Sequence, residues 1–102
     1  RVIGFSMIRK TEDEGALPLT GEIDAFYTHP HFWGKGAGTL LMQESIELAR
    51  KLGFKRLTLW TEERNARPRR FYFLAGWRED GATREREVHG AAIRELRYLR
   101  EL

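Results

Sequence analysis

The chain has 102 residues, a length that fits a single domain spanning residues 1–102. Its 18 basic and 15 acidic residues give a formal charge of +3, and 41% of its residues are hydrophobic, which argues against disorder. No apolar run approaches the ~20 residues that a membrane span needs. The absence of cysteine excludes disulfides and thiolate chemistry, so a reducing cytoplasm is the expected location.

The first half of the chain predicts two strands and a helix. β-Branched and aromatic residues indicate a strand over Val2–Ile8, and a polar loop at 11–20 leads to a second strand over Gly21–Thr28. Apolar residues at 3–4 residue spacing predict a helix over Leu40–Leu52, with Gly53 in the left-handed stop position. The apolar stripe comprises Leu41, Met42, Ile46, Leu48, Ala49 and Leu52.

The second half predicts one more helix and three more strands. Asn65 is the expected N-cap of a helix that runs to Ala75, with Gly76 as its stop. The strands are expected at Leu57–Thr61, around Trp77–Val88 and at Ile93–Leu99, with a turn near His89-Gly90. The order β-β-α-β-α-β-β indicates an α/β (α+β) domain built on one twisted sheet.

A glycine-rich turn over Trp33–Thr39 joins the second strand to the first helix. Its glycines, Gly34, Gly36 and Gly38, alternate with other residues and let a ligand approach the backbone closely. The turn leads into a helix N-terminus, whose free N–H groups and partial positive charge suit an anion such as a diphosphate. A tight turn that serves only packing is the alternative.

Two better-known phosphate motifs do not fit this turn. A dinucleotide fingerprint requires G-x-G-x-x-G, whereas the spacing here is G-x-G-x-G. A P-loop requires glycine five residues before the Gly-Lys pair, and that position holds His29.

Two blocks of sequence nevertheless match one known pattern. Phe26-Tyr27-Thr28-His29-Pro30 precedes the turn, and Asn65 is followed in register by Phe71-Tyr72 and Gly76-Trp77. Together with the turn, these blocks resemble the GNAT superfamily of acetyl-CoA-dependent N-acetyltransferases. Two positions depart from the pattern: Trp33 stands where Arg or Gln is more usual, and Pro68 stands where Ala is usual.

The resemblance implies a binding role for each block. The backbone of Phe26, Tyr27 and Thr28 would pair with the pantetheine arm of coenzyme A, like an added strand. The pyrophosphate would be held by the N–H groups of Trp33, Gly34, Lys35, Gly36, Ala37, Gly38 and Thr39. Asn65 would contact the cofactor, and the Tyr72 hydroxyl would lie near the sulfur.

The chemistry of acetyl transfer gives Tyr72 a role. An amine attacks the thioester and a thiolate leaves, and a neutral phenol can protonate that thiolate as the thioester collapses. A core aromatic that packs on a helix face is the alternative interpretation of Tyr72.

The attacking amine must lose a proton, because a lysine-like amine is mostly charged at pH 7. Glu22 and Asp24 lie two residues apart on one side of their predicted strand, so either is a candidate base. A solvated strand face is the alternative, and the family does not fix the position of the base.

The arginines of the second helix have two interpretations. Arg67 and Arg70 are candidate contacts for the phosphates of coenzyme A, whereas Arg69 is expected on a solvated helix face. His29 and His31 have no cysteine or acidic partner nearby in the sequence, so they are interpreted as loop residues and no metal site is expected.

The resemblance implies a mixed, mostly antiparallel sheet flanked by helices, and transfer of acetyl from acetyl-CoA to a primary amine. GNAT domains normally begin with a further strand, two helices and a strand; we expect these to precede Arg1, or the chain to be a truncated form. A non-catalytic acyl-CoA-binding module is the alternative function. A nucleic-acid partner is not expected, because the sequence lacks a clustered basic stripe and acidic residues are interspersed along the chain. GNAT proteins are often dimers, so a homodimer is a further expectation.

Overall fold

The computed structural model describes residues 3–102, so Val2, predicted in the first strand, lies outside the described residues. The predicted order of elements is confirmed, with one short 3₁₀ helix in addition. The elements are β1 (Gly4–Lys10), β2 (Thr20–Thr28), the 3₁₀ helix (Pro30–Phe32), α1 (Ala37–Lys51), β3 (Arg56–Glu62), α2 (Ala66–Leu74), β4 (Arg78–Val88) and β5 (Ala91–Glu101). The strands form a five-stranded sheet in the order β1-β2-β3-β5-β4, which confirms the expected α+β class.

The chain divides into two compact units within β3. The first comprises Arg1–Leu57 with Glu101–Leu102, and the second comprises Thr58–Arg100. The glycine-rich turn and both candidate carboxylates belong to the first unit. Asn65 and Tyr72 belong to the second.

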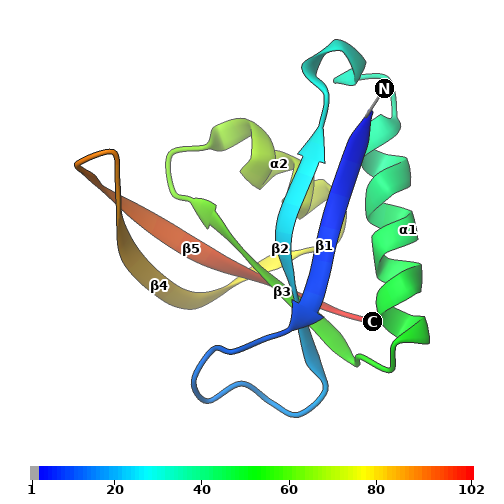
Figure 1. The fold of residues 1–102 in the computed structure, drawn as a ribbon, viewed down its shortest axis with the longest axis horizontal. Helices are drawn as coiled ribbons and strands as arrows, with labels where there is room; N and C mark the ends of the chain where they lie inside the picture. The colour runs from blue at the N-terminus through cyan, green and yellow to red at the C-terminus, as the bar shows by residue number, and fades with distance from the viewer. Residues whose placement is uncertain (1–2) are drawn as a thin grey trace. The chain divides into compact units, whose positions relative to one another are not determined.

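In the first unit, α1 packs against the antiparallel pair β1–β2 (Figure 1). Met42, Ile46 and Ala49 of α1 are buried there, as the helical periodicity predicts. Leu48 and Leu52 were expected on the same stripe, but they are 49% and 58% exposed, so the apolar face is narrower than predicted.

Helix α1 begins three residues before the predicted start, at Ala37 instead of Leu40. The first turn of a helix requires no intrahelical partner for its N–H groups, so the poor helix propensity of Gly38 is tolerated there. The end of α1 agrees with the prediction, because Gly53 has φ +90° and closes the helix in the left-handed conformation.

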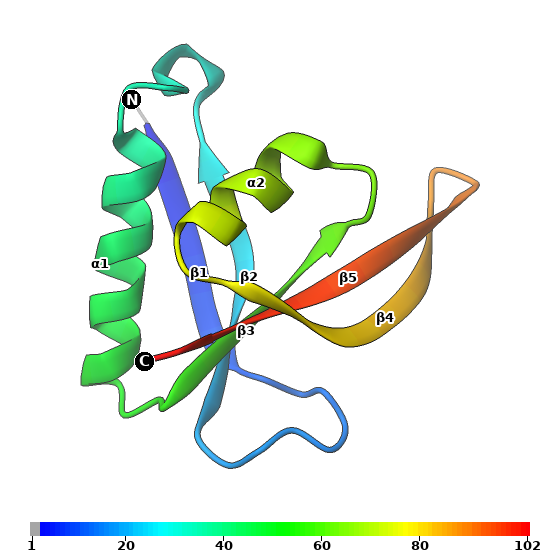
Figure 2. The same cartoon turned by 180° about the vertical axis from the view of Figure 1, so that it is seen from behind.

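In the second unit, α2 follows β3 in the chain (Figure 2), and the ring of its Tyr72 lies 6.0 Å from the ring of Tyr98 on β5. The buried core comprises Leu59, Tyr72, Trp77, Leu96 and Tyr98. Strands β4 and β5 pair antiparallel, and the predicted turn between them is confirmed: His89 and Gly90 both have positive φ, at 51° and 80°. Two consecutive residues with positive φ are typical of the tight turns that match the twist of a hairpin.

Candidate functional site

The glycine-rich turn is a succession of tight backbone turns. The 3₁₀ helix is capped by His29, whose Nδ1 accepts a hydrogen bond from the backbone N–H of His31 at 3.1 Å. The N–H groups of Trp33 and Lys35 then donate to the carbonyls of Pro30 and Phe32, at 3.1 and 3.3 Å. Both N–H groups therefore donate within the turn, and the binding of a pyrophosphate by Trp33–Thr39 stays a prediction.

Left-handed glycines separate this short helix from α1. Gly34 and Gly36 have φ of 75° and 83°, a region that L-residues with a Cβ rarely adopt. A Cβ at either position would meet no atom within 4 Å. Backbone conformation therefore requires glycine here, and the space beside both residues is open.

The N-terminus of α1 presents unsatisfied donors. Gly36 occupies the N-cap position and has no side chain to cap the helix, and the first helical turn holds no acidic residue. The first intrahelical bond runs from the Leu40 N–H to the Gly36 carbonyl. The N–H groups of Ala37, Gly38 and Thr39 consequently have no partner within the helix, which creates a favourable position for an anion.

The end of β2 leads into this turn. The His29 N–H donates to the Ile3 carbonyl, and bonds alternate along an antiparallel pair, so Tyr27 also directs its backbone groups toward β1. Tyr27 lies opposite Phe5 of β1, and the expected pairing of Phe26, Tyr27 and Thr28 with a ligand stays a prediction. Phe26 and Thr28 direct their backbone groups away from β1. The indole N–H of Trp33 donates to the Thr28 carbonyl at 2.9 Å.

A hollow of about 400 Å³ adjoins the turn. Its wall includes Thr28, Lys35, Gly36 and Ala37, all of which the sequence assigned to the cofactor. Leu40, Leu41 and Glu44 of α1 line it further along the helix. The hollow therefore lies against the first turn of α1, where the free N–H groups are.

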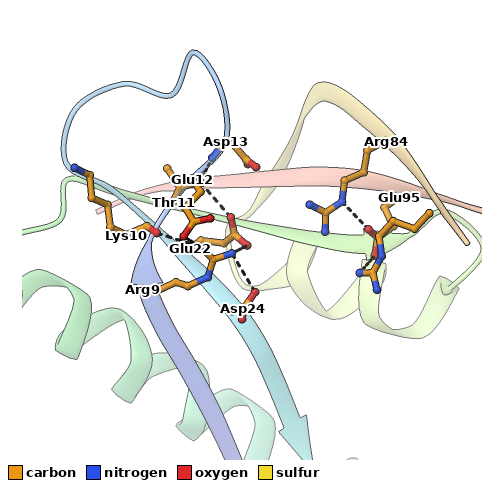
Figure 3. Close-up of polar contacts among 10 residues, drawn as sticks. Arg9, Lys10, Thr11, Glu12, Asp13, Glu22, Asp24, Arg84 and Glu95 are labelled. Carbon is orange, nitrogen blue, oxygen red and sulfur yellow. Dashed lines mark hydrogen bonds and ion pairs between the residues drawn. The ribbon is translucent and has the colours of Figure 1, made fainter. Parts of the chain in front are cut away.

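The two candidate carboxylates lie together near the start of β2 (Figure 3). One Nη2 atom of Arg9, on β1, lies 3.4 Å from Glu22 Oε2 and 3.4 Å from Asp24 Oδ1. The expected placement of both carboxylates on one side of the strand is therefore confirmed. Their exposure differs, because the Glu22 side chain is 5% exposed and the Asp24 side chain is 45% exposed.

A β-bulge separates the two carboxylates. Met7 of β1 faces Ala25 and the next residue, Ile8, faces Ile23, so Asp24 has no partner across the ladder. A bulge redirects the side chain of its extra residue and bends the strand, and bulges are common beside functional sites. Simple alternation along the strand could not predict this irregularity.

The surroundings of Glu22 shift its acidity. Burial raises the pKa of the Glu22 carboxyl, while the hydroxyl of Thr11, which donates to Oε1 at 3.1 Å, and the charge of Arg9 lower it. The nearby negative charges of Asp13 and Asp24 add to the upward shift of the Glu22 pKa. The result is a raised pKa, as expected for a carboxyl suited to accept a proton. The alternative interpretation, in which Glu22 lies on a solvated strand face, is wrong because its side chain is buried.

Helix α2 begins at the predicted position without the predicted cap. Asn65 occupies the N-cap position, but its side chain makes no capping hydrogen bond. Asn65 is exposed, as are Arg67 and Arg70 on the following turn. The side chains expected to contact coenzyme A are thus at the surface of their unit.

The expectation that Arg69 lies on a solvated helix face is wrong, because its guanidinium contacts three other residues. Its Nε donates to the Tyr98 hydroxyl at 3.0 Å, its Nη1 donates to the Glu63 carbonyl at 2.8 Å, and its Nη2 lies 3.4 Å from Glu79. These contacts attach the start of α2 to its neighbours in the second unit. Sequence alone could not reveal them, because Tyr98 is 29 residues away.

Tyr72 belongs to the buried core of the second unit, at 9% exposure. Its ring centroid lies 5.7 Å from Phe71, 6.3 Å from Trp77 and 6.0 Å from Tyr98. Burial raises the pKa of the Tyr72 phenol, which keeps it protonated at neutral pH. Packing and a role as proton donor are therefore compatible for this residue.

The structure adds a second buried carboxylate that the sequence did not single out. Glu95 on β5 accepts a hydrogen bond from Arg84 Nε at 2.7 Å (Figure 3), and Arg86 lies 3.6 Å away. The Arg84 guanidinium also lies 4.3 Å from the centre of the Trp60 ring. Glu95 and Arg84 are opposite each other in the register of the hairpin, so the contact joins β4 to β5.

Within residues 3–102, no group of three or more His, Cys, Asp and Glu side chains is placed to hold a metal ion. None of the helices in that part of the chain combines the length and the apolar character needed to cross a membrane.

Residues 1–77 match the sequence model of the acetyltransferase (GNAT) family, and the chain belongs to that family. An uncharacterized N-acetyltransferase of Mycobacterium tuberculosis is 28% identical over 81 residues, which cover 79% of this chain and 49% of that protein. The chain spans about half the length of the curated relatives it matches.

Solved structures have the same fold. A ribosomal-protein-alanine N-acetyltransferase from Brucella melitensis superposes with a TM-score of 0.82 at 24% identity, over 98% of this chain and 62% of that one. A GNAT family acetyltransferase from Elizabethkingia anophelis, with acetyl-CoA bound, gives a TM-score of 0.79 at 19% identity, over 100% and 70% of the two chains.

Proposed function

We propose that this chain is the acetyl-CoA-binding part of an N-acetyltransferase that moves an acetyl group to a primary amine by direct attack in a ternary complex. The observation that carries the proposal is the N-terminus of α1. Left-handed glycines precede it, no side chain caps it, and a hollow adjoins it. Open N–H donors on a helix N-terminus suit the pyrophosphate of coenzyme A.

The substrate is bound mainly by backbone groups in this proposal. Ala37, Gly38 and Thr39 donate to the pyrophosphate, together with Gly34 and Gly36, while Phe26 and Thr28 offer strand-like bonds to the pantetheine arm. The Asn65 amide is not used to cap α2 and contacts the same substrate. Arg67 and Arg70 are exposed and bind its phosphates.

The chemical step then requires two proton transfers. The amine nitrogen forms a bond to the acetyl carbon, the carbon–sulfur bond breaks, and the electron pair of that bond leaves on sulfur. Tyr72 donates its phenolic proton to that thiolate as the carbon–sulfur bond breaks, because a phenol is protonated at neutral pH and can act as a proton donor. Glu22 or Asp24 accepts the proton that the amine loses, directly or through water.

Turnover tests the function. The complete natural protein is assayed with acetyl-CoA and a panel of small amines, peptide N-termini and lysine peptides, and release of free coenzyme A is followed. Acetylation of any acceptor class supports the proposal. Binding of acetyl-CoA without turnover of any acceptor supports a non-catalytic acyl-CoA-binding module instead.

Tyr72→Phe tests the proton donor. We expect kcat to fall ~100-fold while the affinity for acetyl-CoA stays nearly unchanged, the usual pattern when a general acid is lost. Tyr98→Phe is the matched control, because it removes a phenol from the same core, and that hydroxyl is bonded to Arg69. The control should lower stability and leave kcat within about twofold. Full activity of Tyr72→Phe would leave Tyr72 with a packing role only.

A further inference from the structure

The glycine-rich turn is attached to the end of β2 by a side chain. The indole of Trp33 donates its Nε1 proton to the backbone carbonyl of Thr28 at 2.9 Å, which closes a loop of six residues. The backbone N–H of the same residue donates to Pro30, so Trp33 is fixed through both its backbone and its side chain. Gly34, the first left-handed glycine, follows immediately.

We propose that Trp33 is a positioning residue for acetyl-CoA binding, which its indole N–H achieves by holding the glycine-rich turn against the end of β2. This inference rests on the proposed function. Trp33 does not act by touching the reacting atoms. It acts by keeping the free N–H groups of α1 and the outward-facing groups of Thr28 at a constant separation.

The surroundings of Trp33 support a role for the hydrogen bond over burial of the ring. The Trp33 residue is 48% exposed, whereas Trp77 is fully buried. A tryptophan retained for core packing buries its ring. Here about half of the residue faces solvent, and its polar N–H is directed at a main-chain carbonyl.

The hydrogen bond links the turn to Thr28, which lines the hollow beside the turn. Thr28 contributes to its wall from the strand, and Gly36 and Ala37 contribute from the turn. Between them the backbone passes Gly34 and Gly36, the two positions with the greatest conformational freedom. Ordering such a segment when a ligand binds lowers affinity, and a bond that orders it beforehand removes part of that loss.

The residue types that are usual at position 33 suggest variants that separate the side-chain N–H donor from the aromatic ring. Arg or Gln is usual here in the family pattern, and both have side-chain N–H donors. Trp33→Gln retains a side-chain N–H donor. Trp33→Met introduces a side chain of nearly the same size and flexibility as Gln, but without an N–H donor. Trp33→Phe keeps an aromatic ring and removes the N–H.

The test measures acetyl-CoA binding by titration calorimetry, and KM and kcat by turnover, on the complete natural protein. We expect Trp33→Phe and Trp33→Met to weaken binding about three- to tenfold, the range for loss of one neutral hydrogen bond. KM for acetyl-CoA should rise in parallel, while kcat at saturation stays within about twofold. Trp33→Gln should bind within about twofold of the natural protein and at least threefold more tightly than Trp33→Met.

Several outcomes would overturn the inference. Unchanged affinity in both Trp33→Met and Trp33→Phe would show that the bond does not contribute to binding. Equal losses in Trp33→Gln and Trp33→Met would assign the effect to the ring. If Trp33→Phe does not fold, the comparison of acetyl-CoA affinity between Trp33→Gln and Trp33→Met still tests the role of the hydrogen bond. Failure of the natural protein itself to bind acetyl-CoA would instead contradict the proposed function.

Discussion

The two ends of β2 differ in the kind of chemical group that they present. At the Thr28 end, the groups available to a ligand are backbone N–H and C=O groups, and their positions depend on the left-handed conformations of Gly34 and Gly36. At the other end the groups are the carboxylates of Glu22 and Asp24, which Arg9 holds together. A site made of backbone tolerates changes of side chain but is sensitive to an added Cβ or charge. A site made of side chains is sensitive to isosteric replacements.

The electrostatics of the two ends also differ. The first turn of α1 holds no acidic residue, and its dipole favours an anion. Around Arg9 lie the carboxylates of Glu12, Glu22 and Asp24, each within 3.5 Å of its guanidinium. Acidic surroundings favour a protonated amine, so the contrast matches the two substrates of the proposed reaction: an anionic acyl donor and a cationic acceptor.

The largest expected effect is at the carboxylate end. Glu22→Gln and Asp24→Asn preserve shape and remove the ability to accept a proton. We expect one of the two variants to lower kcat/KM by ~100-fold, the usual size of general-base catalysis, and acetyl-CoA affinity to stay unchanged. The rising limb of the pH–rate profile should shift in that variant toward the limb of the amine alone. Steady-state kinetics between about pH 6 and 10 measure both effects.

Glu12→Gln is the control for this pair. Glu12 also lies near Arg9, at 3.5 Å, but its side chain is 88% exposed, and it lies in the loop after β1. Its removal should change the rate less than about twofold. If neither Glu22→Gln nor Asp24→Asn changes the pH–rate profile, the base lies elsewhere or the enzyme selects the small neutral fraction of its amine.

The next largest effect is expected at the glycine-rich turn. Gly36→Asp places a Cβ in a left-handed position and a negative charge beside the helix N-terminus. We expect acetyl-CoA binding to weaken by about 2 kcal/mol, roughly 30-fold. Titration calorimetry with acetyl-CoA measures the loss, and circular dichroism establishes that the variant folds.

Gly53→Asp is the matched control for strain. Gly53 has φ +90°, a Cβ there meets no atom within 4 Å, and the residue lies just beyond the other end of the same helix. The variant should therefore lose stability through backbone strain and retain affinity. Equal affinity in the folded Gly36→Asp protein would show that the turn is only a packing element.

Local sequence signals predicted most of this fold. The periodicity of α1 and the glycines at 53 and 76, both left-handed in the structure, depend on residues a few positions apart. The glycine-rich turn was recognised for the same reason. What was missed depends on contacts between distant residues: Arg9 with Glu22, Arg69 with Tyr98, and the register shift that leaves Asp24 unpaired. One sequence does not specify which strands will become neighbours.

The early start of α1 has a different origin. Propensity disfavours Gly38 in a helix, so the prediction began at Leu40. The helix begins at Ala37 in the structure, because the N–H groups of a first helical turn make no intrahelical hydrogen bond that Gly38 could weaken. The same property leaves the donors that the proposed function uses. The tolerance of Gly38 and the open anion site therefore have one cause, because the N–H groups of the first helical turn have no intrahelical partner.

The smallest expected effect concerns the stability of the carboxylate end. Burial raises the pKa of Glu22 above its value in the unfolded chain, so the folded state binds the proton more tightly than the unfolded state does. The contribution of Glu22 to stability is therefore greatest below the unfolded pKa and falls as pH rises through the folded pKa. This sign is opposite to that of a carboxylate stabilised mainly by an ion pair.

Glu22→Gln should therefore be at least as stable as the natural protein at neutral pH. Gln can still accept the hydrogen bond from Thr11, and the lost partner, Arg9, is 40% exposed, so its ion pair contributes little. The difference in melting temperature between variant and natural protein should grow as pH rises from about 4 and become constant above the folded pKa. Thermal unfolding across that range measures it. A variant that loses stability relative to the natural protein as pH rises would mean that the charge pair with Arg9 outweighs burial. If Glu22 is also the base, the same substitution should lower the rate without lowering the melting temperature, a combination that a purely structural carboxylate would not produce.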